Sequence, residues 1–262
     1  MTAEASPANS APPIIAPDAE VVIAIKDLHK SFGENKVLQG FDLTVRRGES
    51  VMVLGKSGSG KSVLIKCIVG LLTPDKGSIS VLGEDMLALD TAALDRVRVK
   101  IGFLFQSSAL YDSMTVRENL EFPLRRHWIA QEGSDSEALV KEALENVGLE
   151  NTIDMYPSEL SGGMRRRIGL ARTLILKPEI VLYDEPTTGL DPITGKEIVE
   201  LILRLQKKYG TSSVIISHDL NVAKLAANRI AVLIDGRNHA EGSYEELYAM
   251  DDPQVKPFFI FM

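Results

Sequence analysis

The stretch that decides the fold occupies residues 55–62 and reads Gly55-Lys56-Ser57-Gly58-Ser59-Gly60-Lys61-Ser62. This run matches G-x-x-x-x-G-K-[ST] at every fixed position. The apolar run Val51–Leu54 before it predicts a short buried strand, and the residues from Lys61 to Leu71 predict a helix. A glycine-rich turn between a strand and a helix is typical of a phosphate-binding loop, because backbone N–H groups and the helix N-terminus attract phosphate oxygens. We therefore expect Lys61 to reach the β- and γ-phosphates of a nucleotide and Ser62 to offer its hydroxyl to Mg²⁺.

Apolar runs along the rest of the chain predict strands that alternate with helices. The expected strands are Val21–Ile25, Val37–Val45, Ile79–Leu82, Ile101–Phe105, Ile180–Tyr183, Ser213–Ser217 and Ile230–Ile234. Residues 115–176 are more polar and mostly helical, with one amphipathic helix at Glu137–Val147, and a further helix is expected at Ile193–Lys208. This alternation favours an α/β fold with a mainly parallel sheet covered on both faces. The sequence shows no internal repeat, so we expect one nucleotide site per chain.

Two carboxylates follow the expected strand Ile180–Tyr183. Asp184 is placed to hold Mg²⁺ through water, and Glu185 would point toward the γ-phosphate and polarise the attacking water. An acidic pair after a strand is a weak signal by itself, but this pair lies downstream of a complete phosphate loop. His218 follows the strand Ser213–Ser217, and the residues alone leave open whether it is structural or contacts the γ-phosphate.

Composition narrows the class of protein. The 262 residues suffice for one large α/β domain, and the net charge of −7 disfavours nucleic acid as a partner, because phosphate backbones bind basic surfaces. The basic run Arg165–Arg167 is therefore interpreted as a charged helix face that pairs locally. The single cysteine, Cys67, lies in an apolar stretch and is expected to be a buried thiol. One cysteine allows no disulfide within the chain, which fits a reducing compartment.

The two ends of the chain suggest domain boundaries. Residues 1–20 begin with a segment rich in Ala, Pro and Ser and are expected to form a disordered arm. Residues 21–250 would form the folded domain. Residues 251–262 would form a tail whose apolar end, Pro257–Met262, either frays or docks on a neighbouring subunit, with docking favoured. No apolar run approaches the ~20 residues that span a bilayer, and the N-terminus lacks the features of a secretory signal, so we expect a cytoplasmic location.

Leu160-Ser161-Gly162-Gly163-Met164 is the most specific motif outside the phosphate loop. Ser-Gly-Gly at a helix start forms an anion-binding nest, although the same residues could cap a helix without a ligand. The run resembles LSGGQ, the signature motif of ABC ATPases, with Met164 in place of glutamine. In that family the signature of one subunit contacts the ATP held by the other, so the resemblance implies a dimer that sandwiches two Mg·ATP. It also implies a P-loop NTPase fold of the ABC ATPase type, with a RecA-like core, a small antiparallel β subdomain and a helical subdomain at about residues 107–176.

Further motifs match the family over nearly the whole folded chain. Gln106 matches the Q-loop glutamine, which contacts Mg²⁺ and the attacking water and faces the membrane subunit. Gly189-Leu190-Asp191 resembles the D-loop, which implies that Asp191 lies at the dimer interface. His218 matches the switch histidine, which steadies the developing charge. Phe32 stands where the family places an aromatic that stacks on adenine, although an aromatic packed under a turn is the alternative.

The segment after Gln106 favours one branch of the family. Leu104–Val116, Phe122–Arg125, Gly162–Arg167 and Asp191–Thr194 resemble the ATPases of Mla/Mce-type lipid transporters. Those ATPases work at the cytoplasmic face of the inner membrane with integral membrane permease subunits and an Mce-type lipid-binding protein, and they move phospholipids between bacterial membranes. In the family, the segment after Gln106 receives the permease's coupling helix. Val63 departs from the threonine usual after the phosphate-loop serine, but Ser62 remains to bind Mg²⁺.

The resemblance implies a mechanism and leaves alternatives. Glu185 would orient water in line with the γ-phosphate, Gln106 would sense it, and Ser161 and Gly163 of the opposite chain would complete the cage around the nucleotide. Hydrolysis would then reopen the dimer and move the permease. An ATPase of another transporter branch, such as an amino-acid importer or a lipoprotein releaser, shares this chemistry and differs only in cargo. A soluble ABC ATPase of DNA repair is disfavoured, because no long heptad run separates the phosphate loop from Asp184.

Overall fold

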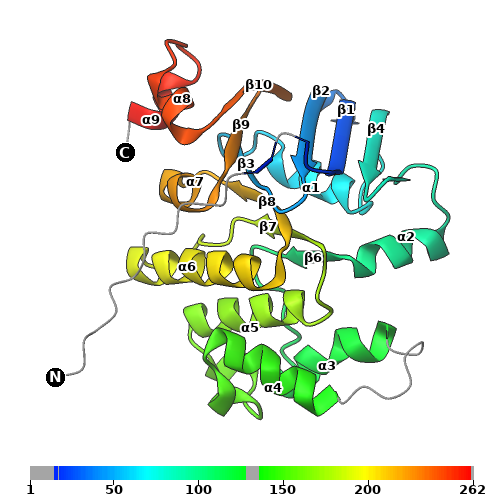
Figure 1. Cartoon of the computed structure of the whole chain (residues 1–262), viewed down its shortest axis with the longest axis vertical. Helices are drawn as coiled ribbons and strands as arrows, with labels where there is room; N and C mark the ends of the chain where they lie inside the picture. Colours follow the sequence, from blue (N-terminus) through cyan, green and yellow to red (C-terminus); the bar gives the residue numbers. More distant parts are fainter. Residues whose placement is uncertain (1–14, 17, 128–135, 261–262) are drawn as a thin grey trace.

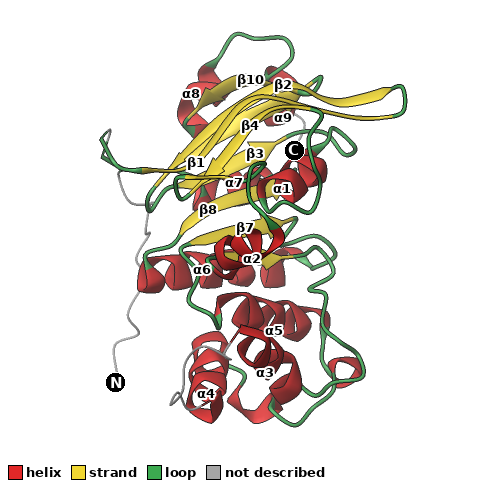
Figure 2. Ribbon diagram, turned by 90° about the vertical axis from the view of Figure 1, so that its right-hand side faces the viewer, coloured by secondary structure: helices red, strands yellow, loops and turns green. Residues whose placement is uncertain are grey.

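The structure, a computed structural model, describes residues 15–16, 18–127 and 136–260. Most of the expected N-terminal arm, residues 1–14 and 17, lies outside the described residues, as do the last two residues of the tail. The described chain forms two β-sheets and a set of helices. The sheets lie toward one end of the molecule, and helices α3 (Val116–His127), α4 (Ser136–Val147) and α5 (Gly162–Leu174) lie at the other (Figures 1 and 2). No helix in the described part is long and apolar enough to cross a membrane.

The six-stranded sheet carries the phosphate loop. Its order is β10-β9-β3-β8-β7-β6, with β3 (Ser50–Leu54), β6 (Ile101–Leu104), β7 (Ile180–Asp184), β8 (Ser212–Ser217), β9 (Arg229–Ile234) and β10 (Arg237–Gly242). All neighbouring pairs are parallel except β10 with β9. Every residue of β3, β7 and β8 is buried, as expected for parallel strands covered on both faces. The prediction of a mainly parallel sheet is confirmed, and the loops after β3, β8 and β7 emerge at one shared edge.

A four-stranded antiparallel sheet forms the expected small β subdomain. Its order is β2-β1-β4-β5, with β1 (Val21–Phe32), β2 (Asn35–Arg46), β4 (Lys76–Val81) and β5 (Glu84–Asp85). Strand β1 continues past the predicted end at Ile25 to Phe32. Its pairing with β2 shifts register several times, and Asp27 adopts a positive φ of 46°. Such irregularities break the alternation of buried and exposed residues, which is why periodicity revealed only the first part of this strand.

Helices pack on both faces of the parallel sheet. On one face, Leu64 and Ile68 of α1 (Lys61–Ile68) pack with Val51 and Leu182. On the other, buried residues of α5 and of α6 (Pro192–Tyr209) join Val181 in a second cluster, which also holds the apolar faces of α3 and α4. The predicted helices within residues 115–176 and at Ile193–Lys208 are confirmed. Cys67 is buried in the first cluster, as expected.

Several short elements were not anticipated from the sequence. They are β5, β10, α2 (Thr91–Val99), α7 (Leu220–Ala226), α8 (Tyr244–Ala249) and α9 (Lys256–Ile260), together with the 3-10 turns Glu150–Thr152 and Pro157–Glu159. Helix α1 is also shorter than predicted, because Gly70 adopts a left-handed φ of 71° and the helix ends at Ile68. A side chain at Gly70 would lie 3.0 Å from Leu94, so this turn favours glycine.

The tail folds back on its own chain. Phe259 of α9 is 9% exposed and packs with Leu247 and Val255, and its ring centroid lies 5.5 Å from that of Tyr244. The sequence left fraying and docking on a neighbouring subunit as the alternatives for this tail, and the structure shows that part of it packs within the chain. Ile260 remains 60% exposed at the end of the described residues.

Candidate nucleotide-binding and catalytic site

The phosphate loop joins β3 to α1 and holds Lys61 beneath it. Gly60 caps α1 with a φ of 104°, and a side chain there would lie 2.6 Å from Cγ1 of Val37, so only glycine fits. The Nζ of Lys61 donates to the carbonyl oxygens of Gly55 at 2.8 Å and Lys56 at 3.1 Å. Burial lowers the pKa of Lys61, while the nearby carboxylates Glu185 and Asp184 act in the opposite direction. The ammonium is thus held in a desolvated place that favours an anionic ligand.

Ser62 and Asp184, the residues expected to bind Mg²⁺, lie in contact with each other. The Ser62 hydroxyl donates to Oδ1 of Asp184 at 3.1 Å, and burial raises the pKa of this carboxyl. The described residues contain no group of three or more His, Cys, Asp or Glu side chains arranged to hold a metal. Mg²⁺ does not require one, because it binds through one or two protein oxygens together with substrate phosphates and water. The hydroxyl and carboxylate oxygens present here fit Mg²⁺.

Glu185 lies at the centre of a hydrogen-bonded group. Its backbone adopts a positive φ of 50°, which is uncommon for a residue other than glycine, and its N–H donates to the carbonyl of Ile216 at 2.8 Å. Its carboxylate lies 3.0 Å from Nδ1 of His218 and accepts from the Thr188 hydroxyl at 3.1 Å. The Nζ of Lys61 lies 3.8 Å from Oε1 of the same carboxylate. Strain of this kind gathers at functional sites, and here the carboxylate lies beside Lys61 of the phosphate loop.

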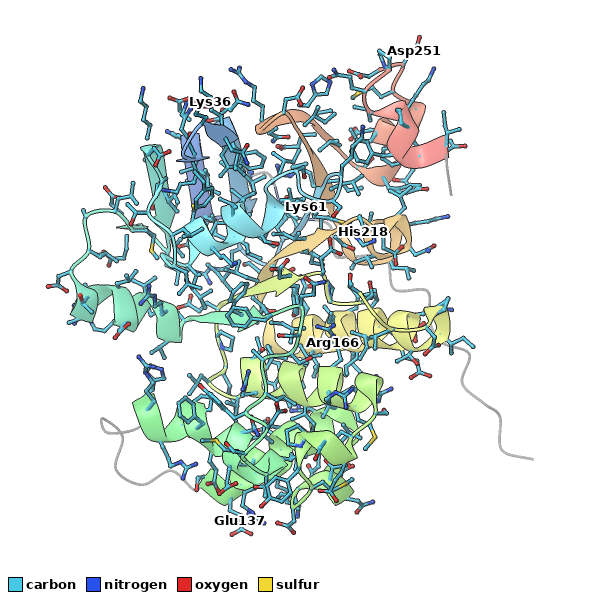
Figure 3. The ribbon with its side chains drawn as sticks, turned by 180° about the vertical axis from the view of Figure 1, so that it is seen from behind. Lys36, Lys61, Glu137, Arg166, His218 and Asp251 are labelled. Carbon is cyan, nitrogen blue, oxygen red and sulfur yellow. The ribbon has the colours of Figure 1, made fainter. Side chains whose placement is uncertain are left out.

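One cavity of about 490 Å³ brings most of the predicted residues together. Those that line it are Phe32, Ser57, Gly58, Gly60, Lys61, Ser62, Gln106, Glu185 and His218. Val37, Val63 and Thr188 line it as well and were not proposed as site residues. The volume falls in the range of small-ligand sites. Figure 3 shows Lys61 and His218 near each other in this part of the molecule.

Phe32 stands at the rim of the cavity and is 49% exposed, so it is not an aromatic packed in the core. Its open ring could stack on a base. Lys56 and Ser59 line a second, adjoining cavity that shares Ser57 and Gly58 with the first. Gly55 lines neither cavity. A side chain at this position would lie 2.7 Å from the Ser59 hydroxyl, so its role is to allow close packing under the loop.

The signature residues lie apart from the cavity of their own chain. Ser161 caps α5 by accepting from the N–H of Met164 at 3.2 Å, and a side chain at Gly163 would lie 2.7 Å from Thr194. Gly162 packs toward Leu190. Asp191 caps α6 by accepting from the N–H groups of Ile193 at 3.1 Å and Thr194 at 3.0 Å. None of Ser161, Gly162, Gly163 and Asp191 lines the cavity, so one chain presents the phosphate loop and the signature nest as two separate surfaces.

Sequence reasoning missed Thr188 and the direct contact between Glu185 and His218. Thr188 carries no motif signal of its own beyond its position three residues after Glu185. The contact follows from the sheet order, because β7 and β8 are neighbours and Asp184 pairs with Ile216. The order of parallel strands cannot be read from apolar runs.

A phosphate loop faced by a strained carboxylate defines the class of phosphate-loop proteins that bind and hydrolyse nucleoside triphosphates. Comparison with known proteins gives the family. The model of the ABC transporter family matches residues 38–188, which is more than half of the chain. A probable ribonucleotide transport ATP-binding protein, mkl of Mycobacterium leprae, is 38% identical over 91% of this chain. The methionine import ATP-binding protein MetN of Brucella abortus is 37% identical over 95% of this chain. The chain spans 68% and 64% of the length of these two relatives.

Solved structures agree with this result. A dimeric post-hydrolysis state of the ATP-binding cassette MJ0796, bound to ADP and Pi, has a TM-score of 0.76 and 34% identity, covering 84% of this chain and 98% of that one. The structure of cbiO1 from Clostridium perfringens, part of the ABC transporter complex cbiONQ, has a TM-score of 0.79 and 27% identity, covering 88% and 91%. The chain belongs to the ABC transporter family. Its fold is that of the ATP-binding cassette, and it is an ABC-type ATPase.

Proposed function

We propose that the chain is the motor subunit of a membrane ABC transporter, that it hydrolyses ATP as a dimer with a second copy of itself, and that the transporter moves phospholipids between bacterial membranes. The observation that carries the proposal is the separation of the phosphate loop from the nest at Ser161–Gly163. The cavity is open on one side, since Phe32 is 49% exposed and the His218 side chain 60% exposed. A second copy supplies the missing donors when its nest covers a nucleotide bound there.

The chain's own side chains have distinct roles in the proposed reaction. Lys61 exchanges its contacts with loop carbonyls for phosphate oxygens, and Ser62 and Asp184 would hold Mg²⁺, which neutralises phosphate charge when bound. Glu185 orients the attacking water. His218 and Thr188 hold the Glu185 carboxylate in place until His218 turns toward the γ-phosphate. Catalysis of this kind depends mainly on positioning and electrostatics.

The segment after Gln106 is the proposed permease contact. Asn119 is fully buried and accepts from the N–H of Tyr111 at 2.8 Å, while its amide donates to the carbonyls of Tyr111, Met114 and Thr115. The Tyr111 ring packs on Phe122 at a centroid distance of 4.9 Å and is 43% exposed. The buried Asn119 side chain therefore fixes this loop, and the loop presents the exposed ring of Tyr111 to solvent. Such an arrangement suits contact with another protein.

The cargo is the finer part of the proposal. It rests on the resemblance of Leu104–Val116 and of the signature with Met164 to the Mla/Mce-type ATPases. Met164 packs against the apolar core of the helical end, so an apolar side chain has a structural place there. An amino-acid importer is the second candidate, because one relative is named as a methionine import protein. We place the subunit at the cytoplasmic face of the inner membrane, held there by the permease.

The test is isolation of the native complex. A tagged chain is purified from membranes in mild detergent, and the co-purifying proteins and bound small molecules are identified by mass spectrometry. We expect a permease, an Mce-type lipid-binding protein and phospholipid. Tyr111→Glu is the matched control, since it should lose the permease and keep the ATP site. An amino-acid permease without an Mce-type partner would refute the phospholipid assignment, and recovery of the chain without any membrane protein would refute the transporter role.

A further inference from the structure

Arg166 is a buried cation in the signature helix α5. It is 5% exposed, and its guanidinium reaches out of the helical end toward the nucleotide cavity. Nη1 donates to the carbonyl of Phe105 at 3.0 Å, and Nη2 donates to the carbonyl of Thr188 at 3.2 Å. In Figure 3, Arg166 lies between the helical end and the region of Lys61 and His218.

This arrangement is costly for stability. Burial is the cause that lowers the pKa of Arg166, no carboxylate of the described residues offsets it, and Nε has no hydrogen-bond partner among them. A guanidinium stays charged at neutral pH. Hydrogen bonds to carbonyls alone offset only part of the free-energy cost of removing this charge from water. The neighbouring arginines differ. Arg167 pairs with the Glu197 carboxylate at 2.8 Å, and Arg165 is exposed to solvent.

The two carbonyls belong to segments that carry the proposed chemistry. Phe105 directly precedes Gln106, and the hydroxyl of Thr188 donates to Glu185 at 3.1 Å. Gln106, Thr188 and Glu185 all line the nucleotide cavity. One planar guanidinium therefore fixes the spacing of the two segments that bring Gln106 and Glu185 to the same cavity.

Helix α5 holds the Gln106 segment at a second point. Nη2 of Arg172 donates to the carbonyl of Ser108 at 3.0 Å, and a side chain at Gly169 would lie 2.8 Å from Cβ of Ser108. Ser108 itself adopts a positive φ of 62°, so this backbone depends on its surroundings. Helix α5, which begins with the signature nest, thus donates hydrogen bonds to the backbone on both sides of Gln106.

We propose that Arg166 is a positioning residue for ATP hydrolysis, which fixes Gln106 and Glu185 relative to each other and to the signature helix. The proposal rests on the roles assigned above to Glu185 and Gln106. Arg166 reaches the site through the backbone carbonyls of Phe105 and Thr188 and does not itself line the nucleotide cavity, so its effect is on the rate of the chemical step and not on nucleotide affinity.

The test measures steady-state ATP hydrolysis and thermal unfolding of the full chain. Arg166→Met keeps an unbranched, flexible side chain, although a shorter one, and removes both donors. We expect kcat to fall about tenfold to a hundredfold, because small displacements of catalytic groups cost this much. KM for ATP should stay within about twofold and Tm should not fall, since replacing a buried ion by an apolar residue is often neutral. Arg166→Gln, which keeps one donor, should have an intermediate kcat.

Arg167→Met is the matched control in the same helix, and its kcat should stay within about twofold of the parent. Thr188→Val should cost less in the Arg166→Met background than alone, because both changes act on the position of Glu185. Unchanged kcat in Arg166→Met, an equal loss in Arg167→Met, or a kcat loss that accompanies a fall in Tm would overturn the proposal. If Arg166→Met does not fold, Arg166→Gln decides by the same criteria.

Glu185→Gln distinguishes a failure of the role of Arg166 from a failure of the assignment of Glu185. Slow hydrolysis by Glu185→Gln together with normal hydrolysis by Arg166→Met would refute the role of Arg166 alone. Normal hydrolysis by Glu185→Gln would refute the assignment of Glu185 and, with it, the inference built on that assignment.

Discussion

Replacing Glu185 by glutamine is the sharpest test of the proposed chemistry. The change keeps the shape of a side chain that is 9% exposed, and the amide oxygen can still accept from the Thr188 hydroxyl. What is lost is the negative charge, which lies 3.0 Å from His218 and 3.8 Å from Lys61. A positioned base contributes about a hundredfold to ten-thousandfold to a rate, which corresponds to about 3–5 kcal/mol of the barrier. We therefore expect kcat to fall by that factor.

Nucleotide affinity should respond differently to the same change. The phosphate-loop backbone and the Lys61 contacts with Gly55 and Lys56 do not involve Glu185, so the Kd for ATP should stay within about threefold. The assays are phosphate release under saturating ATP and equilibrium binding of a fluorescent ATP analogue. Size-exclusion chromatography with ATP should show a stable dimer, because the nucleotide is no longer consumed. A kcat within about threefold of the parent would refute the assignment of Glu185 as the residue that orients water.

Three further predictions address other parts of the site. Phe32→Ala should weaken ATP binding by about 1–3 kcal/mol, measured by calorimetry, with Tm unchanged because the ring is exposed; unchanged affinity would refute base stacking. Gly163→Ala should leave ATP binding to each chain intact and abolish the ATP-dependent dimer in size-exclusion chromatography, since a methyl group there fills the nest and lies 2.7 Å from Thr194; a normal dimer would contradict the sandwich. Burial raises the pKa of Cys67 from 9.0 to about 11, so at pH 8 its thiolate fraction is about a hundredfold smaller than that of an unperturbed thiol. Because the thiolate is the reactive form, Ellman's reagent should react slowly with the folded chain and fast in urea, and fast reaction without urea would contradict the burial of this side chain.

Local sequence patterns predicted the parts of this molecule that depend on neighbours in the chain. The phosphate loop, the buried strands β3, β7 and β8 and the helix α6 each carry their signal within a few residues, through glycines or the spacing of apolar residues. The resemblance to the ABC family then added Gln106, whose importance no local pattern reveals, and gave the nest at Ser161 a role in the dimer.

What sequence reasoning could not supply depends on which segments meet in space. The contact between Glu185 and His218 exists because β7 and β8 are neighbours in the sheet. The burial of Arg166 follows from how α5 packs under two loops, and from the sequence the run Arg165–Arg167 looked like a charged surface. The second half of β1 was missed because its bulges erase the alternation of burial.

The separation of the phosphate loop from the signature nest has a consequence for mixed populations of the chain. If each complete site draws one half from each of two copies, a chain with a defective loop and a chain with a defective nest complement each other. Their mixed pair contains one site built from two sound halves and one built from two damaged halves. Such a mixture regains ATP hydrolysis that neither variant has alone. A mixture of two variants damaged in the same half remains inactive. Genetic complementation between alleles would therefore map which surface a given lesion belongs to.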